Sequence, residues 1–117
     1  MKNDNVVQIK SYAFAVRIIK VFKYLSEQKK EFVLSKQLLR CGTSIGANVR
    51  ESEHAQSKAD FIHKLSISLK EANETEYWLD LLYETNYLTD EEFRNVKNKN
   101  IEILKLLTSI INTSKNK

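Results

Sequence analysis

The sequence contains no proline, only two glycines and a single cysteine among its 117 residues. Ordinary proteins contain about 5% proline and 7% glycine, and an all-β fold needs turn residues about every 8–12 positions. Because this chain cannot supply so many turns, its composition excludes sandwiches and barrels and predicts an all-α protein. The length corresponds to one domain, since domains usually have roughly 100–200 residues.

Long apolar runs are also missing. No run reaches the roughly 18 residues that indicate a membrane span, and residues 1–5 are polar, with no signal-peptide core after them. With Cys41 as its one cysteine, the chain has no internal disulfide and no multi-cysteine metal site. We therefore expect a cytoplasmic protein that does not enter a membrane.

The charge is modest and unevenly distributed. The formal net charge is +4 and the pI about 9.1. Basic residues exceed acidic ones in residues 1–33 and 89–117, whereas acidic residues exceed basic ones in 57–88. A basic excess is typical of nucleic-acid partners, but many ordinary proteins have one too.

Polar breaks and capping signals predict four helices. Ser35 is expected to cap the second helix, because a side-chain oxygen there accepts an unpaired backbone N–H. Ser57 with Asp60 suggests an acidic variant of the capping box for the third helix. Thr89 with Glu92 forms a fuller box for the fourth. Short connections force neighbouring helices to run antiparallel, which predicts an up-down-up-down four-helix bundle. The expected helices span residues 6–29, 36–55, 58–86 and 90–113.

Two of these helices carry more than one apolar face, although a surface helix needs only one. The second faces favour a subunit interface, hence an oligomer. The alternative is a wide core face with scattered apolar surface residues. In the first helix the two faces comprise Phe14, Ile18, Val21 and Leu25, and Tyr12, Ala15, Ile19 and Phe22. In the third they comprise Phe61, Leu65, Leu69, Ala72 and Leu79, and Ile67, Trp78 and Leu81.

The middle of the second helix consists of small residues. Gly42 and Gly46 stand one turn apart, and each costs about 1 kcal/mol relative to alanine in a helix. Close packing must offset this cost, and a neighbouring helix of the bundle is the expected partner.

A polar row follows the same helix, with Arg40, Ser44, Asn48 and Glu51 on one face. If the row is buried, the Arg40 guanidinium needs a carboxylate, and Glu74 on the third helix is a candidate, as are Glu71 and Glu76. We interpret Arg40, Ser44, Asn48, Glu51 and Glu74 as a structural network that sets helix register. If the row is exposed, it has no such role.

Catalytic chemistry is poorly represented. Glu51 and His54 match half of a di-iron motif, but the second half has Asp60 before His63 instead of glutamate. Surface histidines beside a turn explain this pattern better than a metal site. Cys41 and the serines have no base placed beside them by sequence. We expect no catalytic residue, metal or cofactor.

Basic side chains on the first and fourth helices are the candidate binding residues. Lysine and arginine rows neutralise phosphates and bind nucleic acid without sequence specificity. The alternative is a solvated helix face. The candidates are Lys10, Arg17, Lys20, Lys23, Lys30, Arg94 and Lys97.

Residues 38–88 carry a family resemblance. The characteristic residues are Leu38-Leu39-Arg40, Thr43 to Val49, Glu51, Ser57 to Phe61, Lys70 to Leu79 and Asn86-Tyr87-Leu88. In this pattern the chain resembles the bacterial four-helix-bundle proteins encoded within 23S ribosomal RNA intervening sequences, whose relatives include the retroelement accessory variability proteins. The family motif corresponds to Arg40, Ser44, Asn48, Glu51, Asp60 and Glu74, which we interpret as fold-defining.

The resemblance implies a homopentameric ring. It also implies, through the accessory-protein branch, a basic ring surface that binds nucleic acid and a reverse transcriptase. Our first hypothesis is therefore a non-enzymatic, ring-forming protein that binds structured RNA or DNA. The second is a protein-interaction scaffold, for example for a nucleic-acid enzyme, without direct nucleic-acid binding. A metal-dependent enzyme using His54 and His63 is a third.

Overall fold

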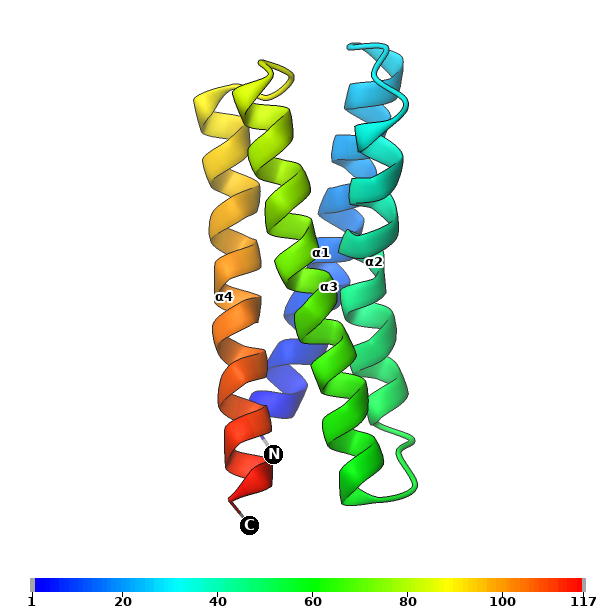
Figure 1. The fold of residues 1–117 in the computed structure, drawn as a ribbon, viewed down its shortest axis with the longest axis vertical. Helices are drawn as coiled ribbons and strands as arrows, with labels where there is room; N and C mark the ends of the chain where they lie inside the picture. Colours follow the sequence, from blue (N-terminus) through cyan, green and yellow to red (C-terminus); the bar gives the residue numbers. More distant parts are fainter. Residues whose placement is uncertain (1, 117) are drawn as a thin grey trace.

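The computed structural model describes residues 2–116, with side chains from residue 6 onward. It contains the helices α1 (Lys2–Glu27), α2 (Leu34–Ser52), α3 (Lys58–Glu84) and α4 (Asp90–Lys115). Successive helices run antiparallel and form an elongated bundle of 46 × 21 × 19 Å (Figure 1). The predicted all-α class with four helices is confirmed.

The helix boundaries differ from the predicted ones by a few residues. Helix α1 begins before residue 6 and ends at Glu27 instead of 29, α2 spans 34–52 instead of 36–55, α3 ends at 84 instead of 86, and α4 extends to 115 instead of 113. The end of α3 has a clear cause, because Asn86 adopts a left-handed φ of 67°. The N–H groups of Asn86 and Tyr87 then donate to carbonyls of the last turn, a Schellman-type closure.

Two of the predicted caps are present. Thr89 and Glu92 form the reciprocal capping box at the start of α4, with N···O distances of 2.8 and 3.2 Å. Ser57 caps α3 by accepting the Asp60 N–H at 3.0 Å. The Asp60 carboxylate accepts the N–H of Gln56 at 3.3 Å, one residue before the position in a standard box.

The predicted Ser35 cap is wrong. Helix α2 starts two residues earlier than predicted, and the buried Glu31 carboxylate accepts the N–H groups of Val33, Leu34 and Ser35 at 3.1, 3.0 and 2.7 Å. The Ser35 hydroxyl donates to the Glu31 carbonyl at 2.8 Å instead. Two carboxylate oxygens satisfy three donors, which a single serine hydroxyl cannot do.

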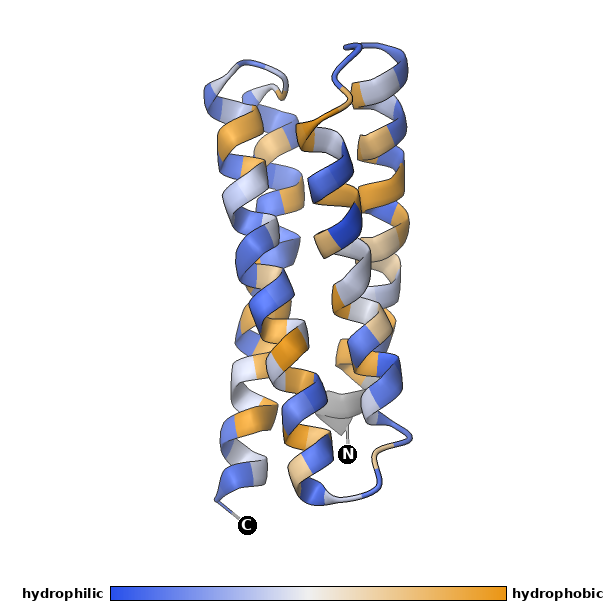
Figure 2. Ribbon diagram, turned by 45° about the vertical axis from the view of Figure 1, so that its right-hand side comes forward, coloured by the Kyte–Doolittle hydropathy of each residue, from blue (hydrophilic) through white to orange (hydrophobic). Residues whose placement is uncertain are grey.

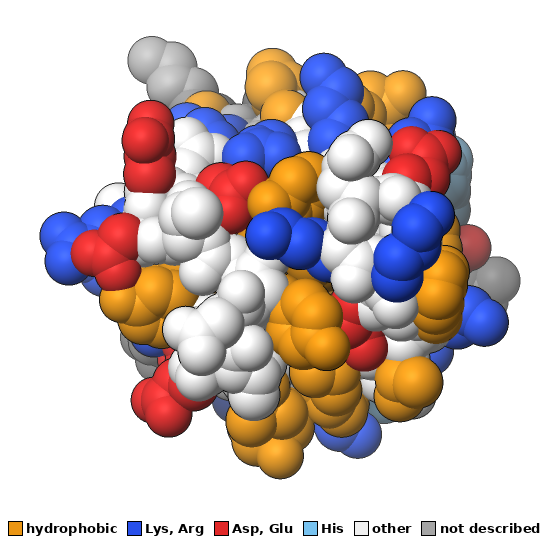
Figure 3. Space-filling view, turned by 90° about the horizontal axis from the view of Figure 1, so that it is seen from above, with side chains coloured by type: hydrophobic (Ala, Val, Ile, Leu, Met, Phe, Trp, Pro, Cys, Tyr) orange, Lys and Arg blue, Asp and Glu red, His pale blue; other side chains and the backbone are white. Residues whose placement is uncertain are grey.

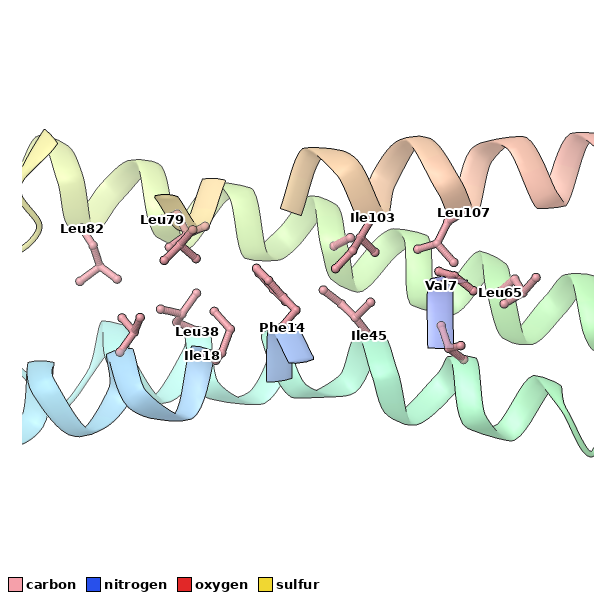
Figure 4. Close-up of a cluster of buried hydrophobic side chains, with 14 of the residues drawn as sticks. Val7, Phe14, Ile18, Leu38, Ile45, Leu65, Leu79, Leu82, Ile103 and Leu107 are labelled. Atoms are coloured by element: carbon pink, nitrogen blue, oxygen red, sulfur yellow. The ribbon is translucent and has the colours of Figure 1, made fainter. Parts of the chain in front are cut away.

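The core lies along the axis between the α1–α2 and α3–α4 hairpins. Phe14, Ile18 and Ile45 point from one hairpin towards Leu79 and Ile103 of the other (Figure 4). Each helix contains both hydrophobic and hydrophilic residues along its length, as amphipathic helices of a bundle do (Figure 2). The core stripe predicted for the first helix is buried throughout. On α3, Phe61 and Leu69 are only half-buried, at the margin of the core.

The two glycines of α2 pack against a neighbouring helix of the bundle, as predicted, and that helix is α1. A Cβ atom at Gly42 would lie 2.8 Å from Cγ1 of Ile18, and one at Gly46 would lie 3.1 Å from the carbonyl oxygen of Ser11. Both glycines therefore allow the two helices to approach closely.

Candidate nucleic-acid interface

A groove of about 320 Å³ runs between α1 and α4. Its two helices are the ones with the predicted basic faces, and four of its lining side chains are cationic while one is acidic. The lining residues are Lys10, Ala13, Phe14, Val16, Arg17, Lys20, Lys99, Glu102 and Ile103. Phe14 and Ile103 are buried, so the base of the groove is part of the core and its rim is basic.

Two contacts across the groove hold its cations in place. The Lys10 ammonium lies 3.0 Å from Glu102, and Nε of Arg17 donates to the Asn95 side chain at 3.2 Å. The two contacts share one antiparallel register. Arg17 follows Lys10 by seven residues on α1, and its partner Asn95 precedes Glu102 by seven residues on α4. Exposed pairs of this kind add little stability. Their effect is to orient Lys10 and Arg17 along the rim.

The other basic residues predicted for the first helix remain available to a ligand, although α1 ends at Glu27 and Lys30 lies in the turn after it. Lys20, Lys23 and Lys30 are exposed and, within the side chains that the structure describes, form no ion pair. The same holds for Lys99 on α4, which was not among the predicted binding residues. The sequence feature that could have identified Lys99 is its position one helical turn before the core residue Ile103.

The two predicted cations of α4 point elsewhere. Arg94 lies 3.3 Å from Asp90 on its own helix. The Lys97 ammonium donates to Asp80 of α3 at 2.9 Å, and this hydrogen bond raises the pKa of Lys97. Neither residue lines the groove.

The predicted polar network is present only in part. Arg40 bridges to α3, with one guanidinium nitrogen 3.1 Å from Glu74 and another 3.5 Å from Glu71. Ser44 and Asn48 instead donate to carbonyls of their own helix, at 2.6 and 2.9 Å. Glu51 is exposed near the end of α2.

Glu71 is the least well-solvated member of this cluster. Its side chain is 14% exposed, and one carboxylate oxygen has no hydrogen-bond partner in the part of the chain described. Burial and the nearby Glu74 charge raise the pKa of Glu71, while Arg40 opposes the change. The cluster links α2 to α3.

The remaining candidates for chemistry are separate from one another. His54 and His63 are both exposed, one just after α2 and the other on α3. Cys41 is buried against Thr75, whose hydroxyl donates to the sulfur at 3.3 Å, and burial raises the pKa of the thiol. Within residues 6–116, histidine, cysteine and carboxylate side chains do not gather in threes as a metal site requires.

The second apolar face predicted for the first helix is partly exposed, because Tyr12 and Ile19 are exposed whereas Ala15 and Phe22 are half-buried. Tyr12 is 61% and Ile19 41% exposed, and Ile9 and Val16 add to the same side at 70% and 40%. Beside this face, a surface groove of about 600 Å³ is lined by residues of both α1 and α2. On α3, the second predicted face is half-buried at Ile67, Trp78 and Leu81. Tyr77, which was not part of that prediction, is 58% exposed and packs edge-on against Trp78. The molecule thus presents apolar surface on two different helices.

No helix within residues 2–116 combines the length and the apolarity needed to cross a bilayer.

Comparison with known proteins places the chain in a family. Among curated proteins no relative matches it. A crystal structure of a protein of unknown function from the S23 ribosomal protein family of Bacteroides thetaiotaomicron is 62% identical, covering 94% of this chain and 98% of the other, with a TM-score of 0.93. The family described as 23S rRNA-intervening sequence protein matches residues 3–109. The chain therefore belongs to the 23S rRNA-intervening sequence protein family.

Proposed function

We propose that this protein is a non-enzymatic, oligomeric helical bundle that binds structured RNA through the groove between α1 and α4. The observation that carries the proposal is the charge of that groove, where Lys10, Arg17, Lys20 and Lys99 converge on a surface with Glu102 as its one acidic lining residue. Such a surface attracts phosphates and releases their counterions.

The kind of recognition follows from the lining. Of the aromatic side chains, only Phe14 reaches the groove, and it is 1% exposed, so bases have no stacking platform there. Contacts to phosphates position a nucleic acid but carry no sequence information. Binding in the groove itself is therefore electrostatic, salt-dependent and indifferent to sequence.

Assembly strengthens such weak contacts. Apolar residues are exposed on both α1 and α3. Two different apolar surfaces on one protomer suit head-to-tail association, in which one surface contacts the other on the next protomer and the chain of protomers closes into a ring. The homopentamer implied by the family resemblance is the form we propose. A ring repeats the groove around one surface, and the repeated contacts gain affinity through multivalency.

The exposed α1 face also supports a second candidate function, that of a protein-interaction scaffold. Ile9, Tyr12 and Ile19 would then contact a different protein, for example a nucleic-acid enzyme. In that case association with the partner would survive nuclease treatment and high salt.

Charge reversal in the groove tests the proposed function. The double variant Lys20→Glu, Lys99→Glu should weaken RNA binding at least tenfold at about 50 mM salt and reduce the slope of log K against log salt by roughly two, because each phosphate contact contributes about 0.9. Fluorescence anisotropy with a labelled RNA hairpin measures both quantities.

The matched control reverses the same charge elsewhere. Lys58→Glu with Lys70→Glu alters two exposed lysines of α3, outside the groove. If both double variants weaken binding equally, only the net charge matters and the groove is not the site. If the native protein binds no RNA at low salt, the scaffold function replaces the proposal.

A further inference from the structure

The turn between α1 and α2 presents two large apolar side chains to solvent. Phe32 is 51% and Val33 72% exposed, although neither belongs to a helix face. Apolar residues before a helix usually pack against the fourth helical residue as a hydrophobic staple. That residue is the exposed polar Gln37, so Phe32 has no staple partner.

The Glu31 cap holds the turn in this conformation. Its buried carboxylate accepts three N–H groups at the start of α2, and in this conformation Phe32 and Val33 are exposed. Lys30, just before it, adopts a left-handed φ of 55°, which is uncommon for a residue with a side chain. The two apolar residues are therefore displayed on a well-defined turn.

Exposed lysines outnumber acidic residues around the turn, where Glu27 is the exposed carboxylate at the end of α1. Lys29, Lys30 and Lys36 are exposed around the turn, and Lys20 and Lys23 lead towards it along the last turns of α1. From Lys20, which lines the groove, to the end of α1 is about 10 Å at 1.5 Å per residue. The end of the molecule that contains the α1–α2 and α3–α4 turns shows basic and hydrophobic side chains next to one another, with acidic side chains among them (Figure 3).

An exposed aromatic ring beside lysines is suited to an unpaired nucleotide. Single-stranded bases stack on aromatic side chains while nearby cations bind their phosphates. The groove has cations but no exposed ring, and the turn supplies the ring that the groove lacks. We favour RNA over a partner protein or an anionic membrane because Lys20, which lines the groove proposed for RNA, lies only about 10 Å along α1 from the turn.

We propose that Phe32 stacks on an unpaired base of an RNA whose paired region lies in the α1–α4 groove, with Val33 packing beside it. The proposal rests on the proposed function of the groove and extends it. The preferred ligand is a helical RNA interrupted by a bulge or loop, not a continuous duplex.

Two RNAs test the proposal. One is a continuous duplex of about 16 base pairs, which is the length of a typical duplex-binding site, and the other is the same stem with a bulge of unpaired adenosines. The native protein should bind the bulged RNA about tenfold more tightly, as base stacking predicts. Phe32→Ala should remove this preference without weakening duplex binding, and Phe32→Trp should retain it.

The groove variant Lys20→Glu, Lys99→Glu separates the two proposals, because it should weaken binding to both RNAs. Phe32 is largely exposed, so its alanine variant should fold, and circular dichroism verifies this. Equal affinity of the native protein for the two RNAs would overturn the stacking proposal while leaving the groove intact. If Phe32→Ala still prefers the bulged RNA, the stacking proposal is also overturned. If the native protein binds neither RNA, both the stacking proposal and the proposed function of the groove are refuted.

Discussion

Glu31 shows how one side chain can organise the chain around it. It lies outside α2, yet its carboxylate satisfies three of the donors that a helix start leaves unpaired. Burial opposes its ionisation, but the hydrogen bonds from Leu34, Ser35 and Val33 outweigh burial, and the pKa of Glu31 lies below its ordinary value. A buried carboxylate thus acts here as a cap and not as an acid or base.

This cap predicts a specific pH dependence of stability. A lowered pKa means that the stabilisation is complete above the ordinary glutamate pKa of about 4.3 and is lost as the pH falls through the lower folded-state value. Glu31→Gln should lower the free energy of unfolding at pH 7 by about 1–2 kcal/mol, and the difference from the native protein should shrink in acid. Urea unfolding at several pH values measures this.

Glu71→Gln provides the control, because the pKa of Glu71 is shifted in the opposite direction. The folded state disfavours its charge, so the neutral variant should be as stable as the native protein at pH 7 or more stable. Equal stability of Glu31→Gln and the native protein at pH 7 would contradict the role of Glu31 as a cap.

The pairing of α1 with α2 depends on helix residues that are poor helix formers. Gly42 and Gly46 weaken α2 as an isolated helix, but they let Ile18 and the backbone at Ser11 approach. Ile18 is completely buried, so it has little room to give way. Packing between the two helices therefore outweighs propensity within one of them.

Gly42→Ala should accordingly destabilise the protein, although alanine is the better helix former. We expect a loss of about 1–3 kcal/mol from the clash with Ile18, as is usual for overpacked cores. Ala47→Gly at an exposed position of the same helix reports propensity alone and should cost about 1 kcal/mol. Thermal or urea unfolding compares the two variants, and a stabilised Gly42→Ala protein would show that the helices can separate freely.

The molecule as a whole presents more apolar surface than its own core requires. The exposed side of α1 lies between the basic groove and the groove beside α2. If this side joins protomers, each copy contributes an RNA-binding groove next to an interface. Assembly and RNA binding then use neighbouring faces of one helix.

Charged residues on this side should break the assembly. Ile9→Glu with Ile19→Glu should reduce the mass of the particle measured by native mass spectrometry or light scattering, because two carboxylates would be buried unpaired at the interface. Asn98→Glu with Ser109→Glu adds the same charge to exposed positions of α4 and should leave the mass unchanged. A native protein that is already monomeric would refute the proposed oligomer.

Sequence reasoning worked best where the signal is local. Missing proline, short polar breaks and the Thr89–Glu92 pair indicated the number of helices and the start of α4, because capping and periodicity involve residues within one or two turns. It failed at Ser35, since the competing Glu31 carboxylate reaches α2 from the preceding turn. It also assigned Lys97 to a binding face, although Asp80 of another helix holds it.

The amino-acid sequence by itself determined the all-α class, the four helices and the core stripe of α1, because these follow from interactions between residues close along the chain. Only the tertiary structure decided which cations share a groove, which face of α1 stays exposed and where Phe32 and Val33 are displayed. Those features depend on the rotation and register of packed helices. Rotation and register are set by close contacts such as Gly42 against Ile18, between residues far apart in sequence.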